Sequence, residues 1–267
     1  GRVPDPQMLF ELAEKAEEAG INSVWVGDSL VSKPRLEPIA TMAGIAARTK
    51  RVRIGTAVLL PAIRKPIPLA HSLATVDILS GGRLVVACGV GGAFTPEQRL
   101  DWVASGVNPG TRAGIFTETV QILKRLWLED SVTFKGKYFE FDDINLKPRP
   151  VQNGGIPLLL GTHFRSGSEA QINRVAKHGD GVMGISDYPE EFAQLLAKVR
   201  QATLDQGRNP DDLEHVFYMT VNINENAAEA RREAEEFLMA YYGIAHWGDR
   251  WGPWGSPSQI VERMREY

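Results

Sequence analysis

Residues 52–91 read VRIGTAVLLPAIRKPIPLAHSLATVDILSGGRLVVACGVG, and they contain the repeating unit on which the fold depends. The runs Val52 to Thr56 and Leu84 to Cys88 are short and apolar, which is typical of strands buried on both faces. Between them, apolar residues at helical spacing predict a helix from about Pro68 to Leu79, and Gly81-Gly82 ends it. A strand, a helix and a second strand in this order predict parallel strands joined by a helical crossover.

The same alternation runs along the rest of the chain. Asp5 and Pro6 predict the N-cap and first position of a helix that Gly20 closes. Further strands are expected at 23–26, 156–160, 181–184 and 216–221, and further helices at about 37–49, 112–127, 168–178, 189–206, 227–241 and from 258. Six apolar strands, each followed by a helix, indicate an α/β protein with a parallel sheet covered by helices.

Two architectures fit this alternation, a doubly wound sheet and a (β/α)₈ barrel. The barrel is favoured because no strand runs directly into a Gly-x-Gly-x-x-Gly loop that opens a helix. The nearest candidate is Gly89-Val90-Gly91-Gly92, but the segment that follows, 93–110, looks too irregular to begin a helix directly.

The composition of the chain excludes several classes of protein. The 267 residues, 43% hydrophobic and 24% charged with a net charge of −3, suit one barrel-sized core, or at most two domains, and give no footprint for nucleic acid. No apolar run approaches the roughly 20 residues that span a bilayer. The one cysteine, Cys88, lies in an apolar strand and is expected to be a packed core thiol. The start of the sequence lacks the apolar segment of a signal peptide, so a cytoplasmic location is expected.

Catalytic groups of such a barrel lie on the loops after the strands. These loops are Gly27-Asp28-Ser29, Thr56 to Pro61, Gly89 to Gly92, Gly161 to Arg165, Gly184 to Ser186, and Asn222 with Asn224. Their glycines either let a flat ligand approach the backbone or simply end the strands. The five histidines show no metal-ligand spacing, and no Gly-x-Ser-x-Gly motif is present. Loops with so few charged groups are expected where a bound organic cofactor carries the chemistry.

The loop Gly161 to Gly167 is a candidate anion site because it precedes a helix that starts near Ser168. Backbone N–H groups at the helix start and nearby hydroxyl and guanidinium groups could converge on a phosphate. An ordinary serine N-cap is the equal alternative. In the same loop, His163 is a candidate proton donor or a simple hydrogen-bonding residue.

Several short motifs occur along the chain in a fixed order. They are SVWVGD at 23–28, RIGTAV at 53–58, DILSGGRL at 77–84, FKGKYF at 134–139, KPRPVQ at 147–152 and GDG at 179–181. In this order and at these spacings the chain resembles, over nearly its whole length, the bacterial luciferase-like family of flavin- or deazaflavin-dependent oxidoreductases. The resemblance implies a single luciferase-like (β/α)₈ TIM-barrel domain over 1–267, with a hairpin insertion, and with insertions at about 93–110, 130–156 and 243–257.

The same resemblance implies that the sequence is short of two barrel strands. Closure of the barrel needs eight strands, whereas six are expected here. The family places one strand before Gly1 and one after Tyr267. We therefore expect the first and last barrel strands to be absent from the sequence shown.

The resemblance also implies a cofactor, FMN or coenzyme F420, at the C-terminal mouth of the barrel. Thr56 and Ala57 would lie against its ring, where relatives often have a backbone bulge or a cis peptide, and Asp28, Gly89 and Gly91 would border the ring pocket. The residues expected to hold the phosphate are Gly161, Thr162, Ser166, Gly167 and Ser168. Arg83 precedes its strand and is expected to be structural.

The sequence departs from the family at Ser29, where many relatives have a histidine that is a candidate for proton transfer. Ser29 could only hydrogen-bond, so His163 or a water would have to substitute. The catalytic candidates are therefore His163, Ser29 and Asp28. Lys65, in Arg64-Lys65-Pro66, stands where relatives often have histidine and is expected to face solvent.

The expected function is that of an oxidoreductase acting on a small apolar organic substrate. FMN would favour a monooxygenase, with a separate flavin reductase as a partner, whereas F420 would favour a dehydrogenase or reductase. A homodimer is expected, with neither nucleic acid nor membrane as a partner. The alternatives are a flavin-binding protein without catalysis and an unrelated phosphate-binding barrel, which would need a lysine or paired carboxylates at the strand ends.

The stretch Tyr241 to Trp254 carries Trp247, Trp251 and Trp254 between glycines. Aromatic side chains of this kind could line an apolar substrate pocket, because they give a large contact area. The alternative, that they pack on the barrel or form a dimer contact, has equal weight.

Overall fold

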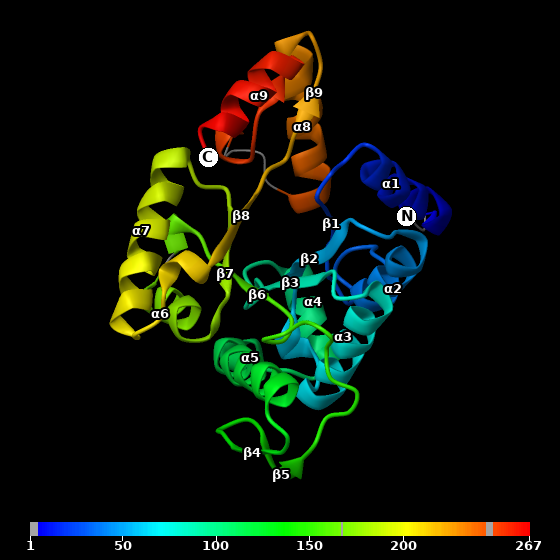
Figure 1. The fold of residues 1–267 in the computed structure, drawn as a ribbon. Helices are drawn as coiled ribbons and strands as arrows, with labels where there is room; N and C mark the ends of the chain where they lie inside the picture. The colour runs from blue at the N-terminus through cyan, green and yellow to red at the C-terminus, as the bar shows by residue number, and fades with distance from the viewer. Residues whose placement is uncertain (1–4, 167, 244–247) are drawn as a thin grey trace. The chain divides into compact units, whose positions relative to one another are not determined.

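The computed structural model describes residues 5–166, 168–243 and 248–267, and the chain divides after Leu160 into two compact units. Figure 1 shows the elements of both units in chain order. Unit 1 contains α1 (Pro6–Glu18), β1 (Ser23–Val26), α2 (Pro38–Arg48), β2 (Arg53–Leu59), α3 (Pro66–Ser80), β3 (Leu84–Cys88), α4 (Pro96–Ser105), α5 (Arg112–Leu128), β4 (Val132–Lys135), β5 (Glu140–Ile144) and the start of β6 (Leu158–Gly161). Unit 2 contains α6 (Glu169–His178), β7 (Gly181–Ile185), α7 (Pro189–Asp205), β8 (Glu214–Tyr218), β9 (Asn222–Ile223), α8 (Ala227–Tyr242), β10 (Trp254–Gly255) and α9 (Pro257–Arg265).

The sheet of unit 1 is parallel, as the alternation predicts. Its strands follow the order β1-β2-β3-β6, with Val24 opposite Ile54 and Val86 opposite Leu158. All five residues of β3 are buried, and α2 packs against α1, α3 and β2. In unit 2, β7 and β8 are also parallel, with Met183 opposite Val216. The α/β class and the parallel pairing of the predicted strands are therefore confirmed.

Local capping signals place the helix ends where the sequence predicts them. The Asp5 side chain accepts a hydrogen bond from the Gln7 amide at 2.9 Å, and Pro6 occupies the first turn of α1. Gly81 ends α3 in the left-handed conformation, with φ at 70°. Arg83 donates to the main-chain oxygens of Ala46, Thr49 and Val52 and is a structural residue, as expected.

Segment 93–110, expected to be too irregular to begin a helix directly after Gly92, contains α4, which begins at Pro96. Thr95 and Gln98 form a reciprocal capping box, and Pro96 sits in the first turn. Gly106, with φ at 69°, ends the helix in the left-handed conformation. The sequence Thr-Pro-Glu-Gln at 95–98 contains this start signal.

The predicted strand 216–221 begins earlier and is interrupted. β8 ends at Tyr218, and the chain then pairs with the tryptophan-rich stretch as the short ribbon β9–β10, in which Asn222 lies opposite Trp254. The Thr220 amide donates to the Trp251 main-chain oxygen at 2.5 Å. This competing partner explains why β8 stops.

Residues 132–144 form an antiparallel hairpin in which Phe134 lies opposite Phe141. The Glu118 side chain of α5 accepts hydrogen bonds from the turn amides of Lys137, Tyr138 and Phe139. The hairpin is thus attached to α5 through its turn. Among the helices that the structure describes, none has both the length and the apolar character needed to cross a membrane.

Candidate functional site

The end of β1 in unit 1 places Asp28 in a buried ion pair. Arg64 donates from Nη1 to Asp28 Oδ2 at 2.5 Å and from Nη2 to Oδ1 at 3.0 Å, and the Leu60 amide donates to Oδ2 at 2.8 Å. Burial lowers the pKa of Arg64, but the hydrogen bonds and charges of Asp28 and Glu37 outweigh it and raise that pKa above its ordinary value. Asp28 therefore fixes the loop that follows β2, and both of its oxygens are occupied.

Ser29 lies in a second hydrogen-bond network, centred on Asp101 of α4. Ser29 Oγ donates to Asp101 Oδ2 at 3.3 Å and accepts from the Lys33 amide at 2.9 Å. Asp101 Oδ1 accepts from the amides of Val31 and Ser32 at 2.7 and 2.8 Å. Burial raises the pKa of Asp101, but these hydrogen bonds lower it below its ordinary value overall. An ionised Asp101 thus holds the loop after β1, which the sequence alone did not indicate.

The backbone at the end of β2 is irregular where the resemblance implies it. The Ala57-Val58 peptide bond is cis, and the pairing register with β3 shifts between Thr56 and Leu59. The Thr56 hydroxyl donates to the Ala87 main-chain oxygen at 2.7 Å, so it belongs to the sheet, whereas Ala57 is partly exposed.

The loop after β3 has a packing reason for one of its glycines. Gly91 has φ at +79°, and a Cβ there would lie 2.8 Å from the ring of Trp102, which is 1% exposed. Trp102 donates from Nε1 to the Gly92 oxygen at 2.8 Å, and Arg112 donates from Nε to the Gly91 oxygen at 3.1 Å. At Gly89 a Cβ would lie 3.1 Å from the Val58 side chain, so these two strand ends approach closely.

In unit 2, the end of β6 carries Thr162 and His163. Thr162 is buried, and its hydroxyl donates to Gln171 Oε1 at 2.9 Å. Burial, and secondarily the charge of Arg165, lowers the pKa of the half-buried His163 below its ordinary value. The imidazole is consequently neutral at neutral pH, which suits it to exchange a proton rather than to carry a fixed charge.

The candidate phosphate loop is described in part. Residues Phe164–Ser166 form a 3₁₀ turn, Gly167 lies outside the described residues, and Ser168 is the N-cap of α6. The Ser168 side chain makes no capping hydrogen bond. The ordinary serine cap is therefore not formed, and the first-turn amides of α6 have no side-chain cap from Ser168.

The end of β7 contributes Ser186, which was expected in a strand-end loop, and Asp187, which the sequence did not predict. Ser186 has φ at +54° and accepts from Arg165 at 3.3 Å. Asp187, which follows, accepts from the Phe164 amide at 2.7 Å. A carboxylate two positions after a buried strand was the available signal, but the following Tyr188-Pro189 made it look like part of a helix start.

The predictions for Lys65 and Cys88 are confirmed, and the described tryptophans of this stretch, Trp251 and Trp254, pack against their neighbours. Lys65 is exposed and Cys88 is buried, as expected. Trp251 is 4% exposed and stacks on Tyr242, with ring centroids 5.0 Å apart, and Trp254 donates to the Thr220 oxygen at 2.9 Å. These contacts favour packing over a substrate lid. Trp247 lies outside the described residues.

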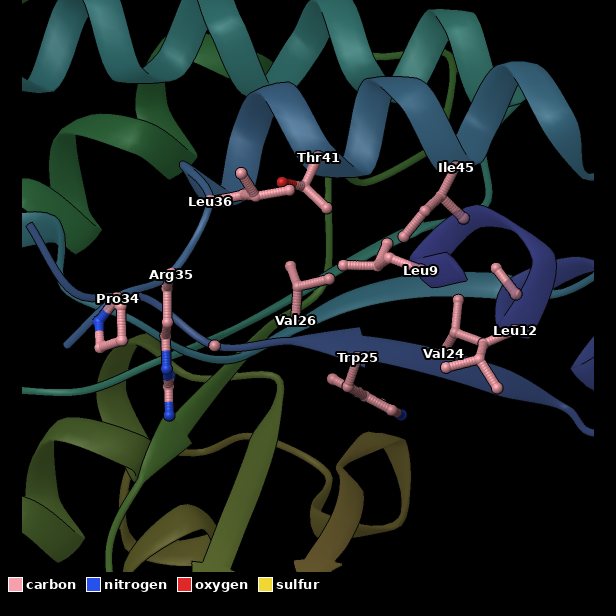
Figure 2. A pocket seen from close by; sticks show the side chains of 12 residues that line it. Leu9, Leu12, Val24, Trp25, Val26, Pro34, Arg35, Leu36, Thr41 and Ile45 are labelled. Atoms are coloured by element: carbon pink, nitrogen blue, oxygen red, sulfur yellow. The ribbon is translucent and has the colours of Figure 1, made fainter. Parts of the chain in front are cut away.

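A pocket of about 430 Å³ lies in unit 1 between α1, β1 and α2. Figure 2 shows Leu9 from α1, Val24 and Val26 from β1 and Ile45 from α2 around it. Its lining is mainly apolar, and the predicted cofactor residues are not among those that line it. Within the described part of the chain, no group of three or more His, Cys, Asp or Glu side chains could hold a metal ion.

Comparison with known proteins gives a consistent picture. The sequence model described as luciferase-like monooxygenase matches residues 2–267. The F420-dependent glucose-6-phosphate dehydrogenase of Kineococcus radiotolerans is 30% identical over 239 residues, which cover 84% of this chain and 66% of that protein. The enzyme of the same name from Amycolatopsis mediterranei is 29% identical over 236 residues, covering 84% and 68%. The chain therefore spans about two thirds of the length of these dehydrogenases.

Solved structures extend the likeness to nearly the whole chain. The monooxygenase RslO1 from Streptomyces bottropensis has a TM-score of 0.83 and 26% identity, covering 99% of this chain and 84% of its own. An F420-dependent secondary alcohol dehydrogenase, solved with an F420-acetone adduct, has a TM-score of 0.83, 21% identity and coverage of 99% and 86%. At the lower identity the likeness concerns the fold.

Proposed function

The chain belongs to the luciferase-like monooxygenase family, and from this we propose that it is an oxidoreductase that uses FMN or coenzyme F420. The observation that carries the proposal is the family match across residues 2–267. It is supported by relatives whose names include F420-dependent dehydrogenases and monooxygenases. The same match leaves no role for an unrelated aldolase or isomerase barrel.

The strand-end residues fit such a cofactor. In unit 1, the partly exposed Ala57 and the irregular backbone beside it offer main-chain groups and little side-chain bulk. In unit 2, the first turn of α6 lacks a Ser168 cap and suits an anion. We propose that Ala57, Gly89 and Gly91, with the backbone of Thr56, face the ring. We also propose that Gly161, Thr162, Ser166, Gly167 and Ser168 hold the phosphate.

The cofactor, when bound, supplies the electron pair that is transferred. Proton transfer falls to the protein, and His163 is the best of the three candidates. Asp28 is saturated by Arg64 and Leu60, and the Ser29 hydroxyl donates to Asp101, so both position the loop after β1. His163 is half-buried and neutral at neutral pH, so it can exchange a proton with a bound substrate.

We also propose that the substrate is a small apolar organic molecule. Residues 1–267 would form a single (β/α)₈ barrel domain with a hairpin insertion. A homodimer, a flavin reductase partner for the FMN case and a cytoplasmic location remain predictions. The second candidate function is a flavin-binding protein without catalysis, which the serine at position 29 favours.

Thermal unfolding with each cofactor tests the binding step. A ligand at 100 times its Kd adds about 2.7 kcal/mol to the unfolding free energy. We expect FMN or F420 to raise Tm by roughly 5–10 °C. Riboflavin, which lacks the phosphate, is the matched control and should shift Tm less. An unchanged Tm with both cofactors, and no bound cofactor by absorbance, would contradict the proposal.

Turnover separates the remaining alternatives. Oxygen uptake with reduced FMN and an apolar substrate would identify a monooxygenase, whereas oxygen-independent reoxidation of reduced F420 would identify a reductase. Tight cofactor binding with no turnover of any substrate would favour the non-catalytic flavin-binding protein.

A further inference from the structure

Asp187, at the end of β7 in unit 2, carries a buried carboxyl oxygen without a partner. The residue is 0% exposed. Its Oδ2 accepts from the Phe164 amide at 2.7 Å, but its Oδ1 has no hydrogen-bond partner among the described residues. Because buried polar atoms in proteins nearly always have a partner, this oxygen requires an explanation.

Among the described residues, the charged side chains around Asp187 form hydrogen bonds with other partners and none with its Oδ1. Glu191 of α7 is engaged with Arg250, whose Nη2 lies 2.9 Å from Glu191 Oε1, and Arg165 donates to Ser186. The Tyr267 hydroxyl donates to the Asp187 main-chain oxygen at 2.6 Å and leaves the carboxyl untouched. Within the described residues, Asp187 forms no ion pair.

Burial raises the pKa of Asp187 above its ordinary value, and the negative charge of Glu191 acts in the same direction. The Phe164 amide and the positive charges of Arg165 and Arg250 oppose the shift but do not cancel it. A neutral carboxyl has a hydrogen to donate, and a buried donor without an acceptor is unfavourable.

The other carboxyl oxygen of Asp187 lies beside the loop that follows β6. This oxygen, Oδ2, accepts from the amide of Phe164, which lies in the described part, residues 161–166, of the candidate phosphate loop. Ser186, immediately before it, is buried and has φ at +54°, a conformation that non-glycine residues rarely adopt. An ionised carboxylate at this loop would repel a phosphate, whereas a neutral carboxyl would donate to it.

We propose that Asp187 is a phosphate-binding acid, whose neutral carboxyl donates a hydrogen bond from Oδ1 to a phosphoryl oxygen bound between residues 161–166 and the start of α6. The proposal rests on the proposed function for the identity of the phosphorylated molecule, not for the chemistry of the contact. A bound phosphoryl group stabilises the neutral acid further, so affinity falls as the pH rises and Asp187 ionises.

Binding measured against pH tests the hydrogen bond. We would determine Kd for inorganic phosphate, FMN and riboflavin between about pH 5 and about pH 9 for the wild type, Asp187→Asn and Asp211→Asn. Asparagine keeps the acceptor for the Phe164 amide and replaces Oδ1 with a donor that does not titrate. Asp211 is an exposed carboxylate paired with Arg200 and serves as the control.

For the wild type and Asp211→Asn, we expect the Kd of phosphate and FMN to rise by up to about tenfold per pH unit once Asp187 ionises, relative to Asp187→Asn. The ionisation of phosphate itself is common to all three proteins and cancels in this ratio. Riboflavin should bind the three proteins equally. A parallel pH profile in Asp187→Asn, or an equal effect on riboflavin, would overturn the assignment.

Infrared spectroscopy of the ligand-free protein gives a second measurement, which does not depend on the variant folding. In wild-type protein with isotope-labelled aspartate, the carbonyl band of a protonated carboxylic acid should persist to a higher pH than the usual range of aspartate titration. Complete loss of that band within the usual range would overturn the proposal.

The two proposals fail separately. Cofactor binding that Asp187→Asn leaves unchanged at every pH removes this inference alone. If inorganic phosphate binds with the Asp187-dependent pH profile while neither FMN nor F420 binds, the proposed cofactor is wrong and the role of Asp187 stands.

Discussion

At the strand ends of unit 1, the role of a residue cannot be predicted from its amino-acid type alone. Asp28 stands out in the sequence as an acidic residue after a strand, and this suggests catalysis. In the structure its side chain is buried, with Arg64 across a bidentate ion pair. Arg64 is 36 residues further along the chain and also contacts Glu37. The pair therefore acts as a clamp on the loop after β2.

Asp28→Asn tests this clamp. The change leaves the largely buried Arg64 without a full counter-charge, and we expect the unfolding free energy to fall by about 2 kcal/mol. Asp130→Asn is the matched control, because Asp130 is 98% exposed and pairs with Arg149 at the surface. The control should lose less than about 0.5 kcal/mol in urea denaturation. Equal losses would show that the Asp28 pair is no stronger than a surface pair.

At the scale of elements, the connection from β3 to α4 depends on close packing between a loop and a helix. Gly91 combines a positive φ with the nearby ring of Trp102, which is held by its hydrogen bond to Gly92. From the sequence, this glycine either let a ligand approach the backbone or simply ended the strand, and the structure adds a steric reason that holds without any ligand. α4 itself was missed because its core-facing stripe is narrow, with Asp101 and Trp102 its buried residues.

Gly91→Ala and Gly81→Ala separate the cost of a positive φ from the cost of steric contact with Trp102. Both glycines have positive φ, +79° and +70°, but a Cβ at Gly81 meets nothing within 4 Å. We expect Gly81→Ala to cost about 1 kcal/mol from backbone conformation. Gly91→Ala should cost about 2–3 kcal/mol because the buried Trp102 must also move. If the two variants lose similar unfolding free energy in urea denaturation, the Trp102 side chain moves without a measurable cost.

Over the whole molecule, the stability of the fold should depend on pH chiefly on the acid side. Glu17 of α1 accepts hydrogen bonds from the amides of Lys50, Arg51 and Val52, of which Val52 and Arg51 contribute most to lowering its pKa from 4.5 to about 2. Because the folded pKa lies below the unfolded one, the stabilisation is complete above about pH 4.5 and is lost as the pH falls toward 2. The lowered pKa of His163 acts in the same direction at higher pH, and the raised pKa of Asp187 opposes both.

Glu17→Gln isolates this contribution. Glu17 is partly exposed, so after allowance for solvent screening we expect a loss of about 1 kcal/mol at neutral pH. The difference from the wild type should shrink as the pH falls from 4.5 toward 2, where Glu17 itself becomes protonated. Denaturation curves at several pH values measure it, with Glu262→Gln in an exposed part of α9 as the control. A difference that does not vary with pH would assign the effect to packing.

The sequence by itself determined most of the helices and strands, their order and the parallel pairing, and through its motifs the family. The helices and strands follow from the spacing of apolar residues, from the length of apolar runs and from helix caps such as Asp5 and Gly81. All of these signals act over a few neighbouring residues. Only the tertiary structure decided which polar groups meet: Ser29 with Asp101, 72 residues apart, Asp28 with Arg64, and Phe164 with Asp187. Such partners are selected by the packing of whole elements and by the need to satisfy buried polar groups, and neither leaves a local signal in the chain.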